Sequence, residues 1–233
     1  ERCPVAFVGE TTSSDAVELY DSERDEFPVK VPLSMLFGDL PISNIEINQS
    51  TPKQVIDSIN YDLDLSEAIQ RVLSHPSVAS KSFLITIGDR TVGGLVARDQ
   101  LVGRYQVPTS NYAMSTKSFL SNEGDVLSIG EKPTLALKNP AASMRMALAE
   151  ALMNLISAPV KNLDLVRLSA NWMAACGDED ENHALRQGVE ALSSICIDLG
   201  IAIPVGKDSL SMRTKWNEDD QELQVKSPLS GVI

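Results

Sequence analysis

The sequence has little positive charge and no long hydrophobic run, and each shortage excludes a class of protein. No segment approaches the roughly 18 consecutive apolar residues that a membrane span requires, so we expect no membrane partner. Lys and Arg number 20 against 32 Asp and Glu, which gives a formal net charge of -12. Because nucleic-acid binding needs clustered Lys and Arg to contact phosphates, we expect no nucleic-acid partner. Nucleotides are still allowed, since Mg²⁺ can bridge carboxylates and phosphates.

Cysteine is also scarce. The three residues, Cys3, Cys176 and Cys196, are odd in number and widely spaced, so they match neither a disulfide framework nor a zinc site. We therefore expect reduced thiols and a cytoplasmic location. The chain starts at Glu1 instead of Met, without the basic start and apolar core of a secretory signal, as expected for a piece of a longer protein.

Proline distinguishes the first part of the chain from the rest. The apolar run Pro4–Val8 predicts one strand. Across residues 21–60, recurring prolines remove backbone donors and disfavour helix, which predicts an extended linker. A short helix is expected at Ser66–Leu73, capped by the hydroxyl of Ser66. Its apolar positions are expected to face inward: Ala68, Ile69, Val72 and Leu73.

Strand patterns begin after Lys81. Two apolar, β-branched runs, Phe83–Ile87 and Thr91–Val96, flank the turn residues Gly88–Arg90 and predict a hairpin. Short apolar runs predict four further strands, the last of them buried, at Asn111–Ser115, Thr134–Leu137, Val166–Ser169 and Ile201–Val205.

Two longer segments predict helices. Pro140–Ile156 starts with Pro and is dominated by Ala, Leu and Met, which are strong helix formers. Glu181–Leu199 is amphipathic and ends at Gly200. Its apolar residues recur at helical spacing and are expected to face the core: Ala184, Leu185, Leu192, Ile195 and Leu199.

Three clusters could carry chemistry. Gly88–Gly94 with Ala97–Gln100 could order a loop around phosphate, although an ordinary hairpin has the same pattern. Glu150 and Asn154 share one helix face and could ligate Mg²⁺, although the spacing alone favours a surface Glu and a helix-exit Asn. Gly206–Ser209, at the end of a predicted strand, could hold phosphate and metal or could form a simple polar turn.

Many separate motifs, in one order, resemble the second synthetase repeat of the long, single-chain formylglycinamide ribonucleotide amidotransferases. They cover most of the chain beyond the linker: Ile87–Val92, Val96–Gln100, Gln106–Pro108, Ser128–Glu131, Ala149–Asn154, Ser169–Met173, Pro204–Met212 and Ser227–Ser230. The opening Glu1–Glu10 resembles the end of the preceding domain.

The resemblance implies an α+β fold of the aminoimidazole ribonucleotide synthetase N-terminal type, a mixed sheet with helices packed on one face. Residues 1–20 would be the tail of a preceding B domain, residues 21–77 a linker with a short helix, and residues 78–233 the second A domain. The parent enzyme would be an ATP-dependent, glutamine-using ligase. Its other parts would be the partners of this chain, namely the first A domain, the second B domain and the glutaminase.

The resemblance also implies an auxiliary site for ADP or ATP with Mg²⁺. Lys81 would contact the nucleotide, while Glu150 and Asn154 would ligate the metal. A third ligand position, Asp in the family, holds Asn111 here, so we expect weaker metal binding.

No catalytic residue of the parent falls within this chain, so we expect the fragment to be inactive alone. Cys176 stands in a motif without a nucleophile, and His75 and His183 are expected at a linker end and on a helix surface. Two alternatives are a scaffolding domain with a decayed nucleotide site and another synthetase of the same superfamily. Because unpaired strand edges invite pairing, a homodimer through A-domain strands is also expected.

Overall fold

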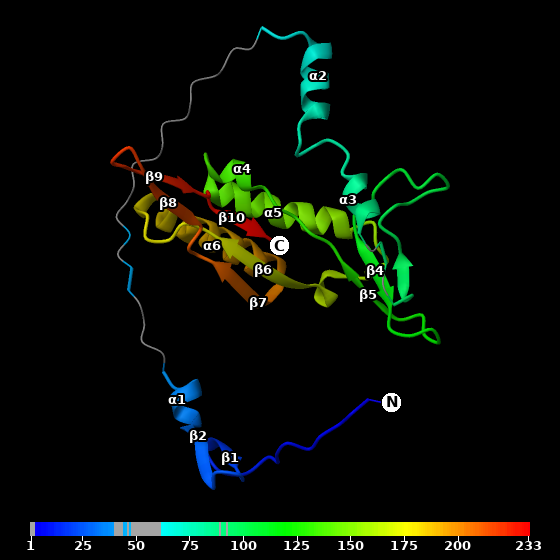
Figure 1. Cartoon of the computed structure of the whole chain (residues 1–233). Coiled ribbons are helices and arrows are strands. Elements are labelled where there is room, and N and C mark those ends of the chain that lie inside the picture. Colours follow the sequence, from blue (N-terminus) through cyan, green and yellow to red (C-terminus); the bar gives the residue numbers. More distant parts are fainter. Residues whose placement is uncertain (1–2, 40–43, 46, 48–61, 89, 92) are drawn as a thin grey trace. The chain divides into compact units, whose positions relative to one another are not determined.

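The computed structural model describes residues 3–39, 44, 45, 47, 62–88, 90, 91 and 93–233 (Figure 1). It divides into two compact units, Glu1–Glu46 and Ile47–Ile233. In the described part of the chain, no helix is long and apolar enough to cross a membrane.

The N-terminal unit is a hairpin followed by a short helix. Strand β1 (Ala16–Asp21) pairs antiparallel with β2 (Glu26–Pro32), and α1 (Leu33–Phe37) follows directly. Asp25 adopts a positive φ of 55° in the turn, where its carboxylate accepts a hydrogen bond of 2.8 Å from the hydroxyl of Tyr20.

Two predictions for this region are wrong. Pro4–Val8 is irregular and its Phe7 is 98% exposed, because no neighbouring strand pairs with this run in the described residues. The prolines within residues 21–60 do not keep that whole segment free of regular structure, since β2 and α1 lie inside it. Pro28 lies where the pairing register shifts, and a bulge is a strand position at which Pro is tolerated. Residues 40–43, 46 and 48–61 of the predicted linker lie outside the described residues.

The second unit begins with two helices. The predicted helix at Ser66–Leu73 is confirmed as α2 (Leu65–Ser74), but its cap is the Asp64 carboxylate, which accepts a 3.0 Å hydrogen bond from the Glu67 amide. The predicted inward-facing side is wrong: Ala68 is only half-buried, and the other three residues are exposed, namely Ile69, Val72 and Leu73.

The predicted first strand of the hairpin is wrong as well. Phe83–Ile87 lies in the helix α3 (Ser82–Ile87), whose Thr86 hydroxyl donates hydrogen bonds of 3.2 Å to the carbonyls of Ser82 and Phe83. A short apolar run does not distinguish a strand from a helix by its pattern alone. Of the second predicted strand, Val92 lies outside the described residues, and among the described ones only Val96 lies in a strand, at the start of β3.

A small antiparallel sheet follows in the order β3-β4-β5. Its strands are β3 (Val96–Arg98), β4 (Ala113–Thr116) and β5 (Gly124–Leu127). The strand predicted at Asn111–Ser115 is therefore confirmed, but it starts later than expected.

The core lies between a mixed sheet and two long helices. The sheet has the order β10-β6-β7, where β10 (Ser230–Val232) is antiparallel and β7 (Ala202–Ser209) parallel to the central β6 (Arg167–Met173). Along β6, Leu168 and Ala170 are buried and Arg167 and Ser169 exposed, so the helices cover one face. Figure 1 shows these helices, α5 (Pro140–Leu155) and α6 (Glu179–Leu199), side by side. The predicted α+β fold with helices on one face is confirmed.

Helix caps set the ends of these two helices. The Asn139 side chain accepts a 2.9 Å hydrogen bond from the Ala142 amide, and Pro140 occupies the first turn of α5. The Asp178 side chain caps α6, which therefore begins two residues before the predicted start. Gly200 ends α6 with a φ of 68°, as the sequence predicted. Of the residues of α6 expected to face the core, Leu192 is buried, Leu199 is exposed and three are partly buried: Ala184, Leu185 and Ile195.

One methionine fills the point where α5, α6 and β10 meet. Met144 is fully buried. A Cβ added at Gly231 would lie 2.2 Å from its sulfur, and one added at Gly188 would lie 3.0 Å from its Cγ and 2.8 Å from a methyl of Leu229. Both glycines therefore leave the space that this side chain occupies.

Three further sequence expectations fail in the core unit. Thr134–Leu137 is not a strand, because Pro133 starts the short helix α4 (Pro133–Ala136). Gly206–Ser209 is not a turn, because it continues β7 in register with β6, and Ser209 pairs with Met173. β7 is also mostly exposed, not buried as predicted. The strand predicted at Val166–Ser169 is confirmed as the start of β6.

A second hairpin was not predicted. β8 (Arg213–Glu218) and β9 (Gln221–Lys226) pair antiparallel around Asp219 and Asp220, whose φ angles of 50° and 61° suit a tight hairpin turn. The 3₁₀ helix η1 (Leu163–Leu165) precedes β6. The hairpin is tied to α6 by an ion pair of 2.6 Å between Lys226 and Asp178.

Candidate functional site

The segment 128–132 packs directly on α5. A Cβ added at Gly130 would lie 2.1 Å from the carbonyl oxygen of Ala147 and 2.4 Å from the amide nitrogen of Ala151, so only glycine allows this approach. Gly130 also exchanges two backbone hydrogen bonds, of 2.9 and 3.1 Å, with Ile233. The hydroxyl of Ser128 donates a 2.8 Å hydrogen bond to the Ala151 carbonyl. This joint fixes the backbone that faces the predicted metal ligands.

Glu150 and Asn154 both reach the same segment. One carboxylate oxygen of Glu150 accepts a 3.0 Å hydrogen bond from the Glu131 amide, and the other lies 3.3 Å from the ammonium of Lys132. The side-chain amide of Asn154 donates a 2.9 Å hydrogen bond to the Ile129 carbonyl. The two predicted ligands are therefore brought together, one helical turn apart, on one surface of α5.

The donor set suits a hard divalent cation. A carboxylate and an amide oxygen are ligands that Mg²⁺ accepts. The amide nitrogen of Asn154 faces Ile129, which leaves its oxygen as the acceptor. The Lys132 ammonium already forms an ion pair with the Glu150 carboxylate, and both side chains are half-exposed. Among the described residues, no three His, Cys, Asp or Glu form a metal-binding group, so any metal here would rest on this mixed set and on groups outside it.

The other two predicted site residues are separate from this pair. Asn111 is exposed just before β4, and its side chain forms no hydrogen bond within the described ranges. Lys81 is exposed at the start of α3, and its ammonium donates a 3.1 Å hydrogen bond to the Ala79 carbonyl. No hydrogen bond or ion pair in the described part joins either residue to Glu150 or Asn154.

The glycine-rich cluster closes on itself. Arg90 and Asp99 form an ion pair of 2.9 Å, and this hydrogen bond lowers the pKa of the Asp99 carboxyl below its usual value, against the opposing effect of desolvation. The side-chain amide of Gln100 donates to the carbonyl of Arg90. Asp89 and Val92 of this cluster lie outside the described residues. The pair thus holds the loop together instead of leaving both charges free for phosphate.

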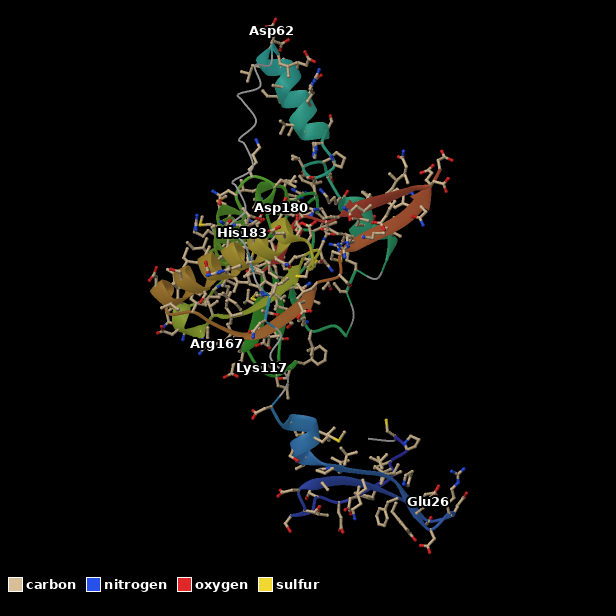
Figure 2. All side chains as sticks on the ribbon, turned by 90° about the vertical axis from the view of Figure 1, so that its left-hand side faces the viewer. Glu26, Asp62, Lys117, Arg167, Asp180 and His183 are labelled. Carbon is tan, nitrogen blue, oxygen red and sulfur yellow. The ribbon has the colours of Figure 1, made fainter. Side chains whose placement is uncertain are left out.

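The remaining candidates have ordinary surroundings. Burial, then the charges of Asp208 and Glu181, raise the pKa of the Cys176 thiol, which disfavours the thiolate that a nucleophile needs. His75 follows α2, and the ring of His183 lies 2.9 Å from the side-chain amide of Gln187 on α6 (Figure 2).

The uncovered face of the mixed sheet borders an open groove of about 1120 Å³. Ser169 and Asn171 on β6 and Lys207 on β7 line it from the sheet. Lys117 and Arg167, labelled in Figure 2, also line it. β7 is the last strand in its sheet, so in the described part of the chain one of its edges has no partner strand.

Comparison with known proteins decides the family. The model of the FGAR-AT PurM_N-like domain matches residues 80–233, which is more than half of the chain. The chain belongs to this family. A phosphoribosylformylglycinamidine synthase of Schizosaccharomyces pombe is 46% identical over 243 residues, which cover all of this chain and 18% of that protein. The chain therefore spans less than a fifth of the length of this relative.

One solved structure supports the fold of the FGAR-AT PurM_N-like family. The PurLQS structure from Thermotoga maritima matches 94% of this chain and 31% of that chain, with a TM-score of 0.57 and 16% identity. At this identity the likeness shows the fold alone. A Thermotoga maritima PurL in complex with ADP has a TM-score of 0.48 at 16% identity, over 94% of this chain and 31% of that chain.

Sequence reasoning missed the partners of Glu150. Lys132 and the Glu131 amide lie 18 and 19 positions away in the sequence, beyond any helical or strand spacing. Gly130 and Pro133, residue types that often interrupt regular structure, were the one available signal, and α4 begins at Pro133.

Proposed function

We propose that the chain is part of an ATP-dependent, glutamine-using ligase that converts formylglycinamide ribonucleotide to the formylglycinamidine in de novo purine biosynthesis. The observation that carries this is the 46% identity, over the whole chain, to an enzyme named phosphoribosylformylglycinamidine synthase. The parent would work in the cytoplasm. Because the chain spans 18% of that relative, we expect no activity from it alone.

The division of the chain follows the same proposal. Residues 1–20 would end a preceding B domain, residues 21–77 would link, and residues 78–233 would form the second A domain. The family match begins at residue 80, close to the proposed start of that domain. The first A domain, the second B domain and the glutaminase would belong to the rest of the parent enzyme.

Within this chain, Glu150 and Asn154 would hold Mg²⁺ at an auxiliary site for ADP or ATP. Such a metal would neutralise charge on the nucleotide phosphates. The Glu131 amide and the Ile129 carbonyl orient the two side chains, so the pair is fixed before a ligand arrives. Lys81 would contact the nucleotide, and Asn111 would face the metal as a neutral ligand.

Calorimetric titration of the chain with ADP, with and without Mg²⁺, tests the proposal. We expect Mg²⁺-dependent binding that is lost in Glu150→Ala and weakened in Asn154→Ala. Glu190→Ala is the matched control, because Glu190 also forms a helix-surface ion pair, of 2.8 Å with Arg186, away from this segment. Binding that ignores Mg²⁺, or that survives in Glu150→Ala, contradicts the assignment of the metal ligands.

A scaffolding role with a decayed site is the second candidate, and two observations favour it. Asn111 supplies no charge, and Lys132 already neutralises Glu150. If the chain binds no ADP and Asn111→Asp restores binding, the site has decayed. If Asn111→Asp changes nothing, Asn111 does not lie near the metal.

The edge of β7 that has no partner strand in the described part of the chain would pair with a strand of another A domain, next to the groove. In the isolated chain that partner is absent, so we expect a homodimer through these strands. Sedimentation velocity at rising concentration measures this, and a purely monomeric profile contradicts it.

A further inference from the structure

A smaller pocket lies on the sheet β3-β4-β5, apart from the pair on α5. Its volume is about 380 Å³, within the range of small-molecule sites. Strand residues Arg98, Met114 and Leu127 line it, together with residues of the loop that joins β3 to β4. Neither Glu150 nor Asn154 lines it, whereas Asn111, the third proposed metal ligand, lies between the lining residues Ser110 and Tyr112.

Arg98 is held in one orientation at this pocket. Its Nε donates a 3.1 Å hydrogen bond to the hydroxyl of Ser110, which in turn donates a 2.6 Å hydrogen bond to the Tyr112 carbonyl. The guanidinium lies 5.0 Å from the centre of the Tyr112 ring, and Tyr112 is only 9% exposed. A stacked guanidinium with a fixed Nε presents its two terminal nitrogens as a rigid fork.

In the described part of the chain, no protein group pairs with that fork. Within the described ranges, Arg98 forms no ion pair, and its terminal nitrogens form no hydrogen bond, in contrast to Arg90, which is paired with Asp99. Neither terminal nitrogen is buried without a partner, so both can be reached from solvent. A half-buried, oriented cation without a counter-ion is the arrangement that binds an anion.

The pocket walls restrict which anion fits. The strand register places Met114 on the same face of the sheet as Arg98, and its apolar side chain suits an apolar body next to the charged group. One guanidinium balances one negative charge, so a monoanion matches it better than a dianion. A carboxylate carries one charge, whereas a phosphate monoester carries nearly two at neutral pH.

We infer that this pocket binds a small monocarboxylate with an apolar body, whose two oxygens pair with the terminal nitrogens of Arg98. The apolar body rests against Met114. The hydroxyl of Ser110 acts through Arg98, because it fixes the Nε and so the direction of the fork.

The test is an amide NMR titration of the whole chain with benzoate, phenyl phosphate and the neutral isostere benzamide. Benzoate is expected to shift the amides of β3, β4 and residues 109–112 and to bind about tenfold tighter than benzamide, because charge-assisted pairs are the stronger ones. Phenyl phosphate is expected to bind more weakly than benzoate. Tighter binding of phenyl phosphate, or equal binding of benzoate and benzamide, overturns the inference.

Variants locate the effect. Arg98→Met keeps an apolar chain over Tyr112 and is expected to reduce benzoate affinity about tenfold, whereas Arg98→Lys reduces it less. Arg104→Met is the matched control: Arg104 lies 5.7 Å from the exposed Tyr105 ring and lines no part of the pocket. Absence of any benzoate-induced shift in the unsubstituted chain up to the solubility limit overturns the inference without a variant. Unchanged affinity in Arg98→Met with a native spectrum overturns it too.

Discussion

Gly130→Ala tests the joint between the segment 128–132 and α5. The added Cβ would lie 2.1 and 2.4 Å from two backbone atoms of α5, at Ala147 and Ala151. A helix backbone cannot move locally, so the segment must move away, and such overpacking costs about 1–3 kcal/mol. The displacement also strains the two hydrogen bonds with Ile233, each worth about 0.5–1.5 kcal/mol. We expect a loss of about 2–5 kcal/mol in the free energy of unfolding.

Urea denaturation followed by tryptophan fluorescence measures this loss, since Trp172 packs against the core. At about 2–4 °C per kcal/mol for a chain of this size, the melting temperature should fall by roughly 4–20 °C. Gly206→Ala is the matched control, because its Cβ would meet nothing within 4 Å and its φ is not positive. If Gly130→Ala is as stable as the control, the close approach to α5 does not exist in solution, and the orientation of Glu150 by this segment is refuted with it.

Three further outcomes are expected. Lys132→Gln should raise Mg²⁺ affinity about twofold to fivefold in a calorimetric titration, because a half-exposed ion pair that competes with the metal is worth under about 1 kcal/mol; lower affinity would mean that the ammonium assists the metal. The hydrogen bond from Lys226 lowers the folded-state pKa of Asp178, so the pair stabilises the fold above the ordinary carboxyl pKa near 4 and is lost as pH falls through the lowered value. The stability difference between the unsubstituted chain and Asp178→Asn, measured by denaturation from pH 6 downward, should therefore shrink below about pH 4; a constant difference would refute the pairing. Burial raises the pKa of the Cys176 thiol, so iodoacetamide should label it more slowly than the exposed Cys3 at neutral pH, as followed by mass spectrometry; equal rates would contradict this burial.

The sequence predicted most accurately the helix ends and spacings that depend on local backbone preferences. Pro140 and Gly200 mark helix ends through their own backbone preferences, and both helices appear where they were expected. The one-turn spacing of Glu150 and Asn154 likewise follows from helix geometry, and the structure places both on one surface.

The predictions that failed depend on neighbours that are distant in the sequence. Gly206–Ser209 has turn-forming residues, yet the parallel pairing with β6 keeps it extended. Phe83–Ile87 has strand-forming residues, yet no strand among the described residues pairs with it, and local hydrogen bonds form a helix instead. The counter-ion of Glu150 could not be read from spacing either, because Lys132 reaches it across the joint at Gly130.

The contact of Met144 with two glycines has a consequence for how relatives of this chain can diverge. A larger residue at position 231 collides with the methionine sulfur, and one at position 188 meets both this side chain and Leu229. A side chain at either position is therefore accepted only if the end of a neighbouring flexible side chain, of Met144 or of Leu229, moves. A shorter residue at 144 would open the space without such a movement, so a side chain at 231 should be tolerated more easily in relatives that have a shorter residue at 144.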